Sequence, residues 1–103
     1  MKKVIDGKLY NTETADRLHD WSNRCPCSDF QYCEEALYRT KKGAFFLAGS
    51  GGPMSKYAQA IEQNSWGGGE GLEPLSTEEA LNWAETHDMD PDEIAEIWPV
   101  EEG

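Results

Sequence analysis

Large aliphatic side chains are scarce in this sequence, and long apolar runs are absent. Leu, Ile, Val and Phe together number sixteen, under a fifth of the 103 residues, and the net charge is −11. This combination lies on the disordered side of a common compositional boundary. Four Trp and four Tyr compensate for it, because each large aromatic side chain can bury roughly 150–250 Å². We therefore expect a folded chain with an aromatic-rich core.

Basic residues are missing from the last third of the chain. Residues 70–103 hold twelve Asp and Glu and no Lys or Arg, whereas residues 1–69 hold nine basic and eight acidic residues. Such asymmetry indicates an interaction surface or an acidic tail. The acidic region would repel phosphate backbones, so direct nucleic-acid binding is not expected. A basic protein surface is the matching partner.

No stretch indicates export or membrane insertion. Only Val4 and Ile5 separate Lys3 from Asp6, which is too few for the apolar region of a signal peptide. No run approaches the roughly 20 apolar residues that a transmembrane helix needs. Three cysteines, an odd number, suit a reducing compartment better than a disulfide framework. The sequence thus predicts a cytoplasmic protein without a membrane partner.

The most apolar stretch predicts two strands joined by a tight turn over residues 34–48. Its large side chains are Leu37, Tyr38, Phe45, Phe46 and Leu47. The turn is expected at residues 40–43, where Gly43 supplies a positive φ. A shorter hairpin is predicted for residues 3–10, because Asp-Gly between apolar pairs is a strong turn signal.

Helices are predicted on both sides of the central hairpin. Ala15, Leu18 and Trp21 recur at three-residue spacing, which favours a helix over residues 13–21. A second short helix is expected from Ser55 to Gln63. The glycine-rich stretches at 49–53 and 65–69 are expected to be loops without regular structure.

Two further helices are predicted in the acidic third. Ser76 and Glu79 form a capping-box pattern for a helix that ends near Thr86. Asp90 is expected to cap the next helix, with Pro91 in the first turn and Glu93 completing a second box. The whole pattern predicts a single α+β domain over residues 1–103. Its small antiparallel β-sheet is centred on the 34–48 hairpin and packed by three or four short helices, and its C-terminal third, 70–103, is acidic and helical.

Three cysteines and a histidine leave a metal site as one alternative. Cys25, Cys27 and Cys33, with His19, offer thiolate and imidazole ligands for zinc. The Cys-x-Cys spacing is not the usual one, and no second pair follows, so buried free thiols are the favoured interpretation. No motif supports a nucleophile with its base. The sequence therefore predicts no enzymatic activity and no cofactor.

The acidic third is the candidate functional surface. Helix capping explains only some of its acidic residues. The residues expected to bind a partner lie on the last two predicted helices and between them: Glu78, Glu85, Asp88, Asp92, Glu93 and Glu96. The plain interpretation is a solvated face that serves solubility. The functional interpretation is an array of carboxylates that imitates nucleic-acid phosphates and occupies a basic groove.

Four stretches resemble small acidic proteins encoded by phages and other bacterial mobile elements. They are residues 4–15 (VIDGKLYNTETA), residues 37–43 (LYRTKKG), Phe46-Leu47 and Pro74-Leu75-Ser76. Proteins of this kind include anti-CRISPR inhibitors, several of which block nucleic-acid entry to a CRISPR effector complex. The resemblance implies a non-enzymatic inhibitor in the cytoplasm of a bacterial host, with a CRISPR effector nuclease or complex as its partner.

Two other functions stay open at this point. The chain fits a structural or regulatory interaction protein of a phage or mobile element, in which the acid serves solubility only. Less favoured is a zinc-binding module built on Cys25, Cys27 and Cys33.

Overall fold

The computed structural model describes residues 1–25, 29–62 and 65–101, which contain eight strands and two helices. In chain order these are β1 (Lys2–Ile5), β2 (Lys8–Asn11), β3 (Asp16–Ser22), β4 (Cys33–Arg39), β5 (Phe45–Gly51), β6 (Gln59–Glu62), β7 (Ser65–Gly67), β8 (Gly69–Leu75), α1 (Thr77–Thr86) and α2 (Pro91–Ile97). Neither helix in these ranges is long and apolar enough to cross a membrane.

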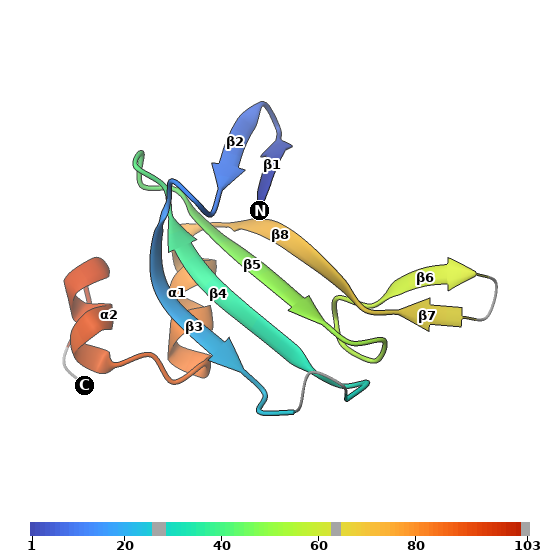
Figure 1. The fold of residues 1–103 in the computed structure, drawn as a ribbon. Helices are drawn as coiled ribbons and strands as arrows, with labels where there is room; N and C mark the ends of the chain where they lie inside the picture. The colour runs from blue at the N-terminus through green and yellow to red at the C-terminus, as the bar shows by residue number, and fades with distance from the viewer. Residues whose placement is uncertain (26–28, 63–64, 102–103) are drawn as a thin grey trace.

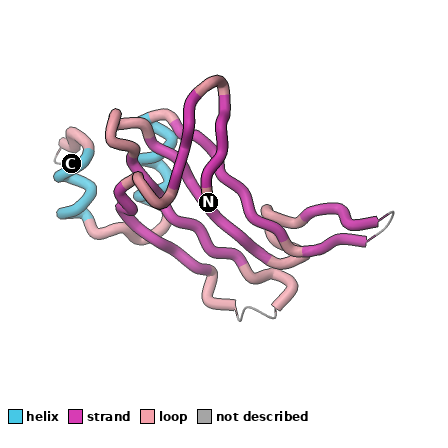
Figure 2. The backbone as a smooth tube through the Cα atoms, turned by 45° about the horizontal axis from the view of Figure 1, so that its top comes forward, coloured by secondary structure: helices cyan, strands magenta, loops and turns pink. Residues whose placement is uncertain are grey.

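The centre of the fold is a four-stranded antiparallel sheet in the order β3-β4-β5-β8. The helices pack on one face of this sheet, and the hairpin β1–β2 stands over one end of the other face (Figure 1, Figure 2). A second two-stranded ribbon, β6–β7, projects beyond one end of the sheet (Figure 1). The predicted α+β class is confirmed, but the described residues contain two helices instead of three or four.

The predicted central hairpin is confirmed as β4–β5. Leu37 pairs with Leu47 and Tyr38 with Phe46. Because successive side chains of a strand alternate between its faces, the first pair joins the core under the helices and the second joins the core under β1–β2. Gly43 has a φ of +88° at the turn, as expected.

The N-terminal hairpin is also confirmed. Val4 pairs with Leu9 and Ile5 with Lys8, which leaves Asp6 and Gly7 as the two turn residues. Their φ values are 52° and 77°. Positive φ at both central residues is the type I′ conformation, whose twist matches that of the flanking strands.

The predicted helix over residues 13–21 is wrong, because this segment contains β3, which pairs with β4. The register shifts between Arg17 and His19, so Leu18 is an extra residue in a β-bulge. At a bulge, two residues of one strand oppose one residue of its partner. The two-residue period of the strand therefore becomes three at this point. Leu18 and Trp21 both contact the helix-side core at a spacing that imitates a helix.

The glycine-rich stretches lie mostly in strand ends instead of the predicted loops, and only residues 52–53 and 68 lie outside the strands. Residues 49–51 complete β5, and residues 65–69 contain β7 and the start of β8. Close backbone packing explains the glycines. A Cβ added to Gly51 would lie 2.6 Å from the carbonyl oxygen of Tyr32, and one added to Gly68 would lie 2.7 Å from that of Gly51. Only a residue without a side chain allows these approaches.

The predicted helix from Ser55 onwards is wrong as well. Its expected last residue, Gln63, lies outside the described residues, but residues 52–58 form turns and bends before β6. The Ser55 hydroxyl donates to the carbonyl of Gly52 at 2.7 Å and accepts the N–H of Tyr57 at 3.2 Å. Such local bonds give the backbone an alternative to a helix.

The two predicted C-terminal helices are confirmed. The Ser76 hydroxyl accepts the N–H of Glu79 at 3.1 Å, and the Glu79 carboxylate accepts the N–H of Ser76 at 2.8 Å, which is the expected capping box. Asp90 caps α2 by accepting the N–H of Asp92 at 2.9 Å. A simple cap thus takes the place of the second box expected through Glu93.

Candidate functional site

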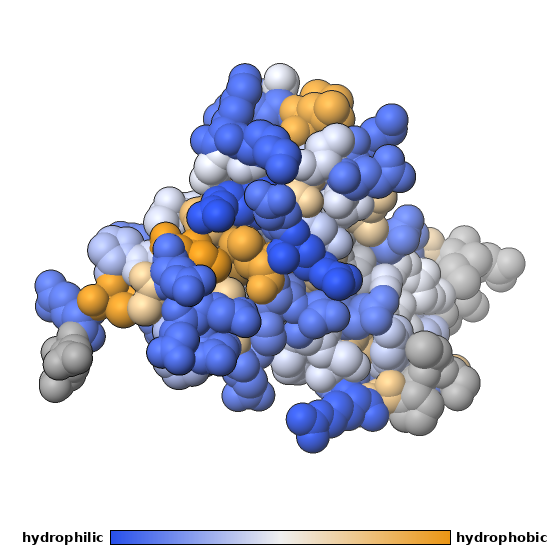
Figure 3. All heavy atoms as spheres, turned by 60° about the vertical axis from the view of Figure 1, so that its left-hand side comes forward, coloured by the Kyte–Doolittle hydropathy of each residue, from blue (hydrophilic) through white to orange (hydrophobic). Residues whose placement is uncertain are grey.

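The six carboxylates predicted to bind a partner all lie at exposed positions of α1, α2 and the turn between them. We call them the acidic surface: Glu78, Glu85, Asp88, Asp92, Glu93 and Glu96. Hydrophilic atoms cover much of the side of the molecule that carries α2, with smaller hydrophobic areas between them (Figure 3). The structure therefore keeps every predicted site residue accessible.

The acidic surface forms one short row on each helix. Glu78 and Glu85 share a face of α1, about 10.5 Å apart along the axis. Asp92 and Glu96 share a face of α2, about 6 Å apart along its axis. Asp88 lies between the helices with a φ of 61°. The positions on each helix have fixed spacing, which an unstructured acidic tail would not provide.

No cation of the described residues neutralises the acidic surface. The ion pairs in that part of the chain use only Asp16 and Glu35 as acids. Neither helix has a basic residue in its last turn. Glu79 has a different role, because its hydrogen bonds with Ser76 hold the pKa of its carboxyl below the usual value. Glu79 is a structural cap, while the carboxylates of the acidic surface face solvent.

Buried aromatic side chains fix the two helices to the sheet. Trp83 of α1 and Trp98, which follows α2, are both buried. Trp98 stacks on Phe45 of β5 with ring centroids 5.3 Å apart. Ala84 and Ile94 complete the contact with the sheet side chains. The acidic surface is therefore carried by helices whose opposite faces are anchored.

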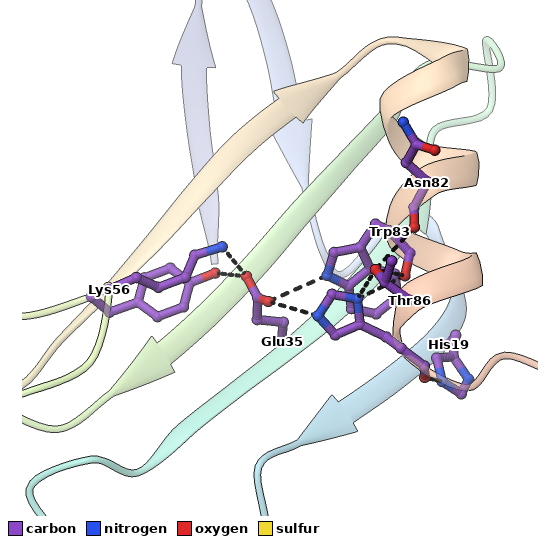
Figure 4. Close-up of polar contacts among 8 residues, drawn as sticks. His19, Glu35, Lys56, Asn82, Trp83 and Thr86 are labelled. Carbon is purple, nitrogen blue, oxygen red and sulfur yellow. Dashed lines mark hydrogen bonds and ion pairs between the residues drawn. The ribbon is translucent and has the colours of Figure 1, made fainter.

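A buried carboxylate forms a second cluster, on the helix side of the sheet (Figure 4). Glu35 of β4 is only 4% exposed. Its Oε2 accepts the hydroxyl of Tyr57 at 2.5 Å and lies 2.6 Å from the Nζ of Lys56. Its Oε1 accepts the Nε1–H of Trp83 at 3.2 Å and lies 3.7 Å from the Nε2 of His87. We call these five residues the Glu35 cluster.

The hydrogen bonds of the Glu35 cluster determine its protonation. Burial raises the pKa of the Glu35 carboxyl. The hydrogen bonds from Lys56, Tyr57 and Trp83 together lower this pKa by more than burial raises it, so it lies below its usual value. Burial and the neighbouring Glu35 carboxylate raise the pKa of the Tyr57 phenol. At neutral pH the carboxylate is therefore ionised and the phenol keeps the proton that it donates.

His87 packs between two tryptophans at the end of α1. Its ring stacks on Trp83 at 4.4 Å and meets Trp21 of β3 edge-on at 4.7 Å. Its Nδ1 lies 2.7 Å from the carbonyl oxygen of Trp83, and it carries a proton because a carbonyl only accepts. The Nε2–H of His19 donates to the carbonyl of His87 at 2.9 Å. These contacts tie β3 to the end of α1.

The geometry of the Glu35 cluster favours anchoring over chemistry. The cluster connects β4, the 52–58 segment and α1, and both carboxylate oxygens already have donors. A buried charge with partners on both oxygens is a satisfied structural group. Glu35 is not among the residues that the sequence predicted as functional. The available signal was strand alternation, which places Glu35 on the same face as Cys33 and Leu37.

The cysteines do not form the alternative metal site within the described residues. Cys25 is half-buried and Cys33 is buried, and both are free thiols. Burial raises the pKa of the Cys33 thiol. Cys27 lies outside the described residues. In the part of the chain that the structure describes, no three His, Cys, Asp or Glu side chains come close enough to hold a metal ion.

No protein-family model, curated protein or solved structure matches this chain. Its function therefore has to be inferred from its residues and their geometry.

Proposed function

We propose that the protein is a non-enzymatic inhibitor that binds a basic protein partner through the acidic surface. In its most concrete form, suggested by the resemblance of the sequence, it is an anti-CRISPR protein of a phage or mobile element. It would act in the cytoplasm of a bacterial host, where it occupies the nucleic-acid path of a CRISPR effector nuclease or complex. The observation that carries the proposal is the set of six exposed carboxylates without a cation, on helices anchored by buried aromatic residues.

Charge and rigidity together support imitation of nucleic acid. A net charge of −11, concentrated at one end of the sequence, creates a field that attracts a basic groove before contact. Carboxylates on anchored helices keep their positions when they bind, so little backbone order has to be gained. The saturated Glu35 cluster offers no free acid or base, which supports a binding role over a catalytic one.

The test compares two triple variants with the same change in charge. The site variant carries Glu78→Gln, Glu85→Gln and Glu96→Gln. The control variant carries Asp6→Asn, Glu13→Gln and Asp29→Asn, all exposed positions away from the helices. Asn is suited to position 6, where φ is 52°. Each variant and the parent are assayed for inhibition of plasmid interference by a panel of CRISPR effectors of different types, and for binding to the inhibited effector.

We expect the site variant to lose inhibition and to bind at least about tenfold more weakly, while the control variant behaves as the parent. The melting temperature of the site variant should be equal or slightly higher, since repulsion among the carboxylates is reduced. A site variant that inhibits as well as the parent contradicts the proposal. A parent that inhibits no effector, yet binds another basic protein through these carboxylates, contradicts only the anti-CRISPR part.

A further inference from the structure

Among the described residues, the hairpin β1–β2 covers one end of the sheet face opposite the helices. There Tyr10 of the hairpin β1–β2 packs on Phe46, with ring centroids 5.5 Å apart. Beyond this contact, strands β3, β4, β5 and β8 line a hollow of about 480 Å³ that opens to solvent. We call it the open-face hollow. Its floor includes the small side chains of Ala36 and Ala48.

The strand register arranges the side chains of the open-face hollow in rows. Ala36 pairs with Ala48, and the next row along the strands on the same face holds Glu34, Ser50 and Glu70. Such rows are about 7 Å apart, and neighbouring strands are about 4.8 Å apart. Two methyl groups therefore lie beside two carboxylates, whose strands are roughly 10 Å apart across β5.

The Glu34 carboxylate is held in place by neutral donors. Tyr32 donates its hydroxyl to Oε2 at 2.5 Å, and Ser50 donates to Oε1 at 3.1 Å. Of the acids in the lining, Glu35 is ion-paired on the helix side, whereas the ion pairs of the described residues do not include Glu34, Glu70 or Asp20. A carboxylate has about four lone-pair sites. Glu34 therefore has acceptors left for a cationic group.

The basic groups of the hollow lie toward its other end. Arg17 of β3 lies opposite Tyr38 of β4. Tyr38 is four residues from Glu34 on the same strand, so Arg17 lies about 13 Å along the sheet from Glu34. The amino group of Met1, also in the lining, donates to Thr12 at 2.9 Å. The end of the hollow away from β1–β2 is consequently acidic.

We propose that the open-face hollow receives an arginine side chain of a protein partner. The aliphatic stem lies on Ala36 and Ala48, and the guanidinium reaches Glu34 and Glu70. Long basic side chains pack their stems on apolar surface while the charged head binds elsewhere. Arginine fits better than lysine, because its planar head has five donors and is more weakly hydrated. A metal ion fits less well, because among the described residues no three ligand groups converge.

This proposal shares only the basic partner with the proposed function. The open-face hollow and the acidic surface lie on opposite sides of the sheet, so each can be tested without the other. The probe is a short glycine peptide with one arginine, blocked at both ends. A matched peptide carries citrulline, which has nearly the same shape and no charge. Both are titrated into isotope-labelled protein and followed through the backbone amide signals.

The arginine peptide is expected to shift the signals of residues 34–36, 48–50 and 70, and the citrulline peptide to leave them unchanged. Glu34→Gln combined with Glu70→Gln should weaken binding at least about tenfold. Ala36→Leu fills the hollow without a change in charge, and it should abolish binding. The melting temperature of each variant shows whether it remains folded.

The site variant of the acidic surface, with Gln at positions 78, 85 and 96, should bind the arginine peptide as the parent does. This keeps a failure here distinct from a failure of the proposed function. Three results would overturn the proposal: equal shifts with both peptides, shifts confined to the acidic surface, or no shift at the highest soluble concentration of the arginine peptide.

Discussion

At the scale of single residues, Glu35 is the most constrained charge of the described chain. It is buried, it is ionised, and all four of its neighbours come from positions more than 20 residues further along the sequence. A hydrogen bond to a charged group contributes about 1.5–3 kcal/mol. We predict that Glu35→Gln destabilises the fold by about 2 kcal/mol, measured by urea unfolding. The matched control is Glu34→Gln at the neighbouring position, where the hydrogen bonds from Tyr32 and Ser50 are exposed to solvent, so stability should change less.

The same carboxylate gives a prediction for pH. The folded-state pKa of Glu35 is below its ordinary value, so its contribution to stability is present above the unfolded-state pKa. It is lost as the pH falls through the folded-state pKa. The free energy of unfolding should therefore fall on acidification below about pH 4.3, the ordinary pKa of Glu. Glu79 acts in the same direction. The acid-induced loss should be smaller in Glu35→Gln than in the parent, and identical slopes would rule out this role.

Tyr57 gives a second prediction at the residue scale. Its ring lies over two glycines of the sheet. A Cβ on Gly49 would clash with the Tyr57 hydroxyl oxygen, whereas one on Gly71 would be 3.4 Å from the ring, an ordinary contact. Because Glu35 holds the Tyr57 hydroxyl, the ring cannot easily move aside. We predict that Gly49→Ala destabilises the protein by about 1–3 kcal/mol through overpacking.

Gly71→Ala is the control for this prediction. Alanine at that position avoids the clash and loses less chain entropy on folding than glycine. Its melting temperature should equal or exceed that of the parent. Equal melting temperatures for the two variants would mean that Tyr57 does not lie on the sheet as described.

At the scale of elements, the turn of the β4–β5 hairpin is the simplest test of the sheet. Gly43 has a φ of +88°, and a Cβ there would meet no atom within 4 Å. Any cost of substitution therefore comes from backbone conformation alone. We predict that Gly43→Val lowers stability by more than about 1 kcal/mol, since a β-branched residue strongly disfavours positive φ. Gly43→Asn should cost clearly less, because Asn tolerates this region. Thermal unfolding of the two variants would show no difference if the turn were placed elsewhere.

At the scale of the whole molecule, the carboxylates of the acidic surface take no part in the contacts that pack the helices on the sheet. The acidic helices pack through tryptophans, while their carboxylates face solvent without cations among the described residues. Repulsion within the acidic surface opposes folding and is screened by salt. We predict that the melting temperature of the parent rises between low and moderate salt. The rise should be smaller in the variant with Gln at positions 78, 85 and 96. Calorimetry at both salt concentrations measures it, and an equal rise in parent and variant would contradict the prediction.

Elements with local signals were predictable from the sequence. Both hairpins with positive-φ turn residues, at Asp6-Gly7 and Gly43, were predicted correctly. The two helices with N-caps at Ser76 and Asp90 were also predicted correctly. In each case the residues that fix the conformation lie within four positions of one another, so no knowledge of the remaining chain is required. The exposed positions of the acidic surface followed from these helices.

Contacts between residues far apart in the sequence determine β3, the glycine-rich strand ends and the burial of Glu35. The bulge at Leu18 gave β3 a helix-like spacing, and only pairing with β4 makes it a strand. Gly51 and Gly68 appear as flexible positions in the sequence, but the close approach of distant backbones requires them. The partners of Glu35 come from the 52–58 segment, at positions 56 and 57, and from α1 and its end, at positions 83 and 87. Contacts between residues so far apart depend on strand order and register, which no local pattern encodes.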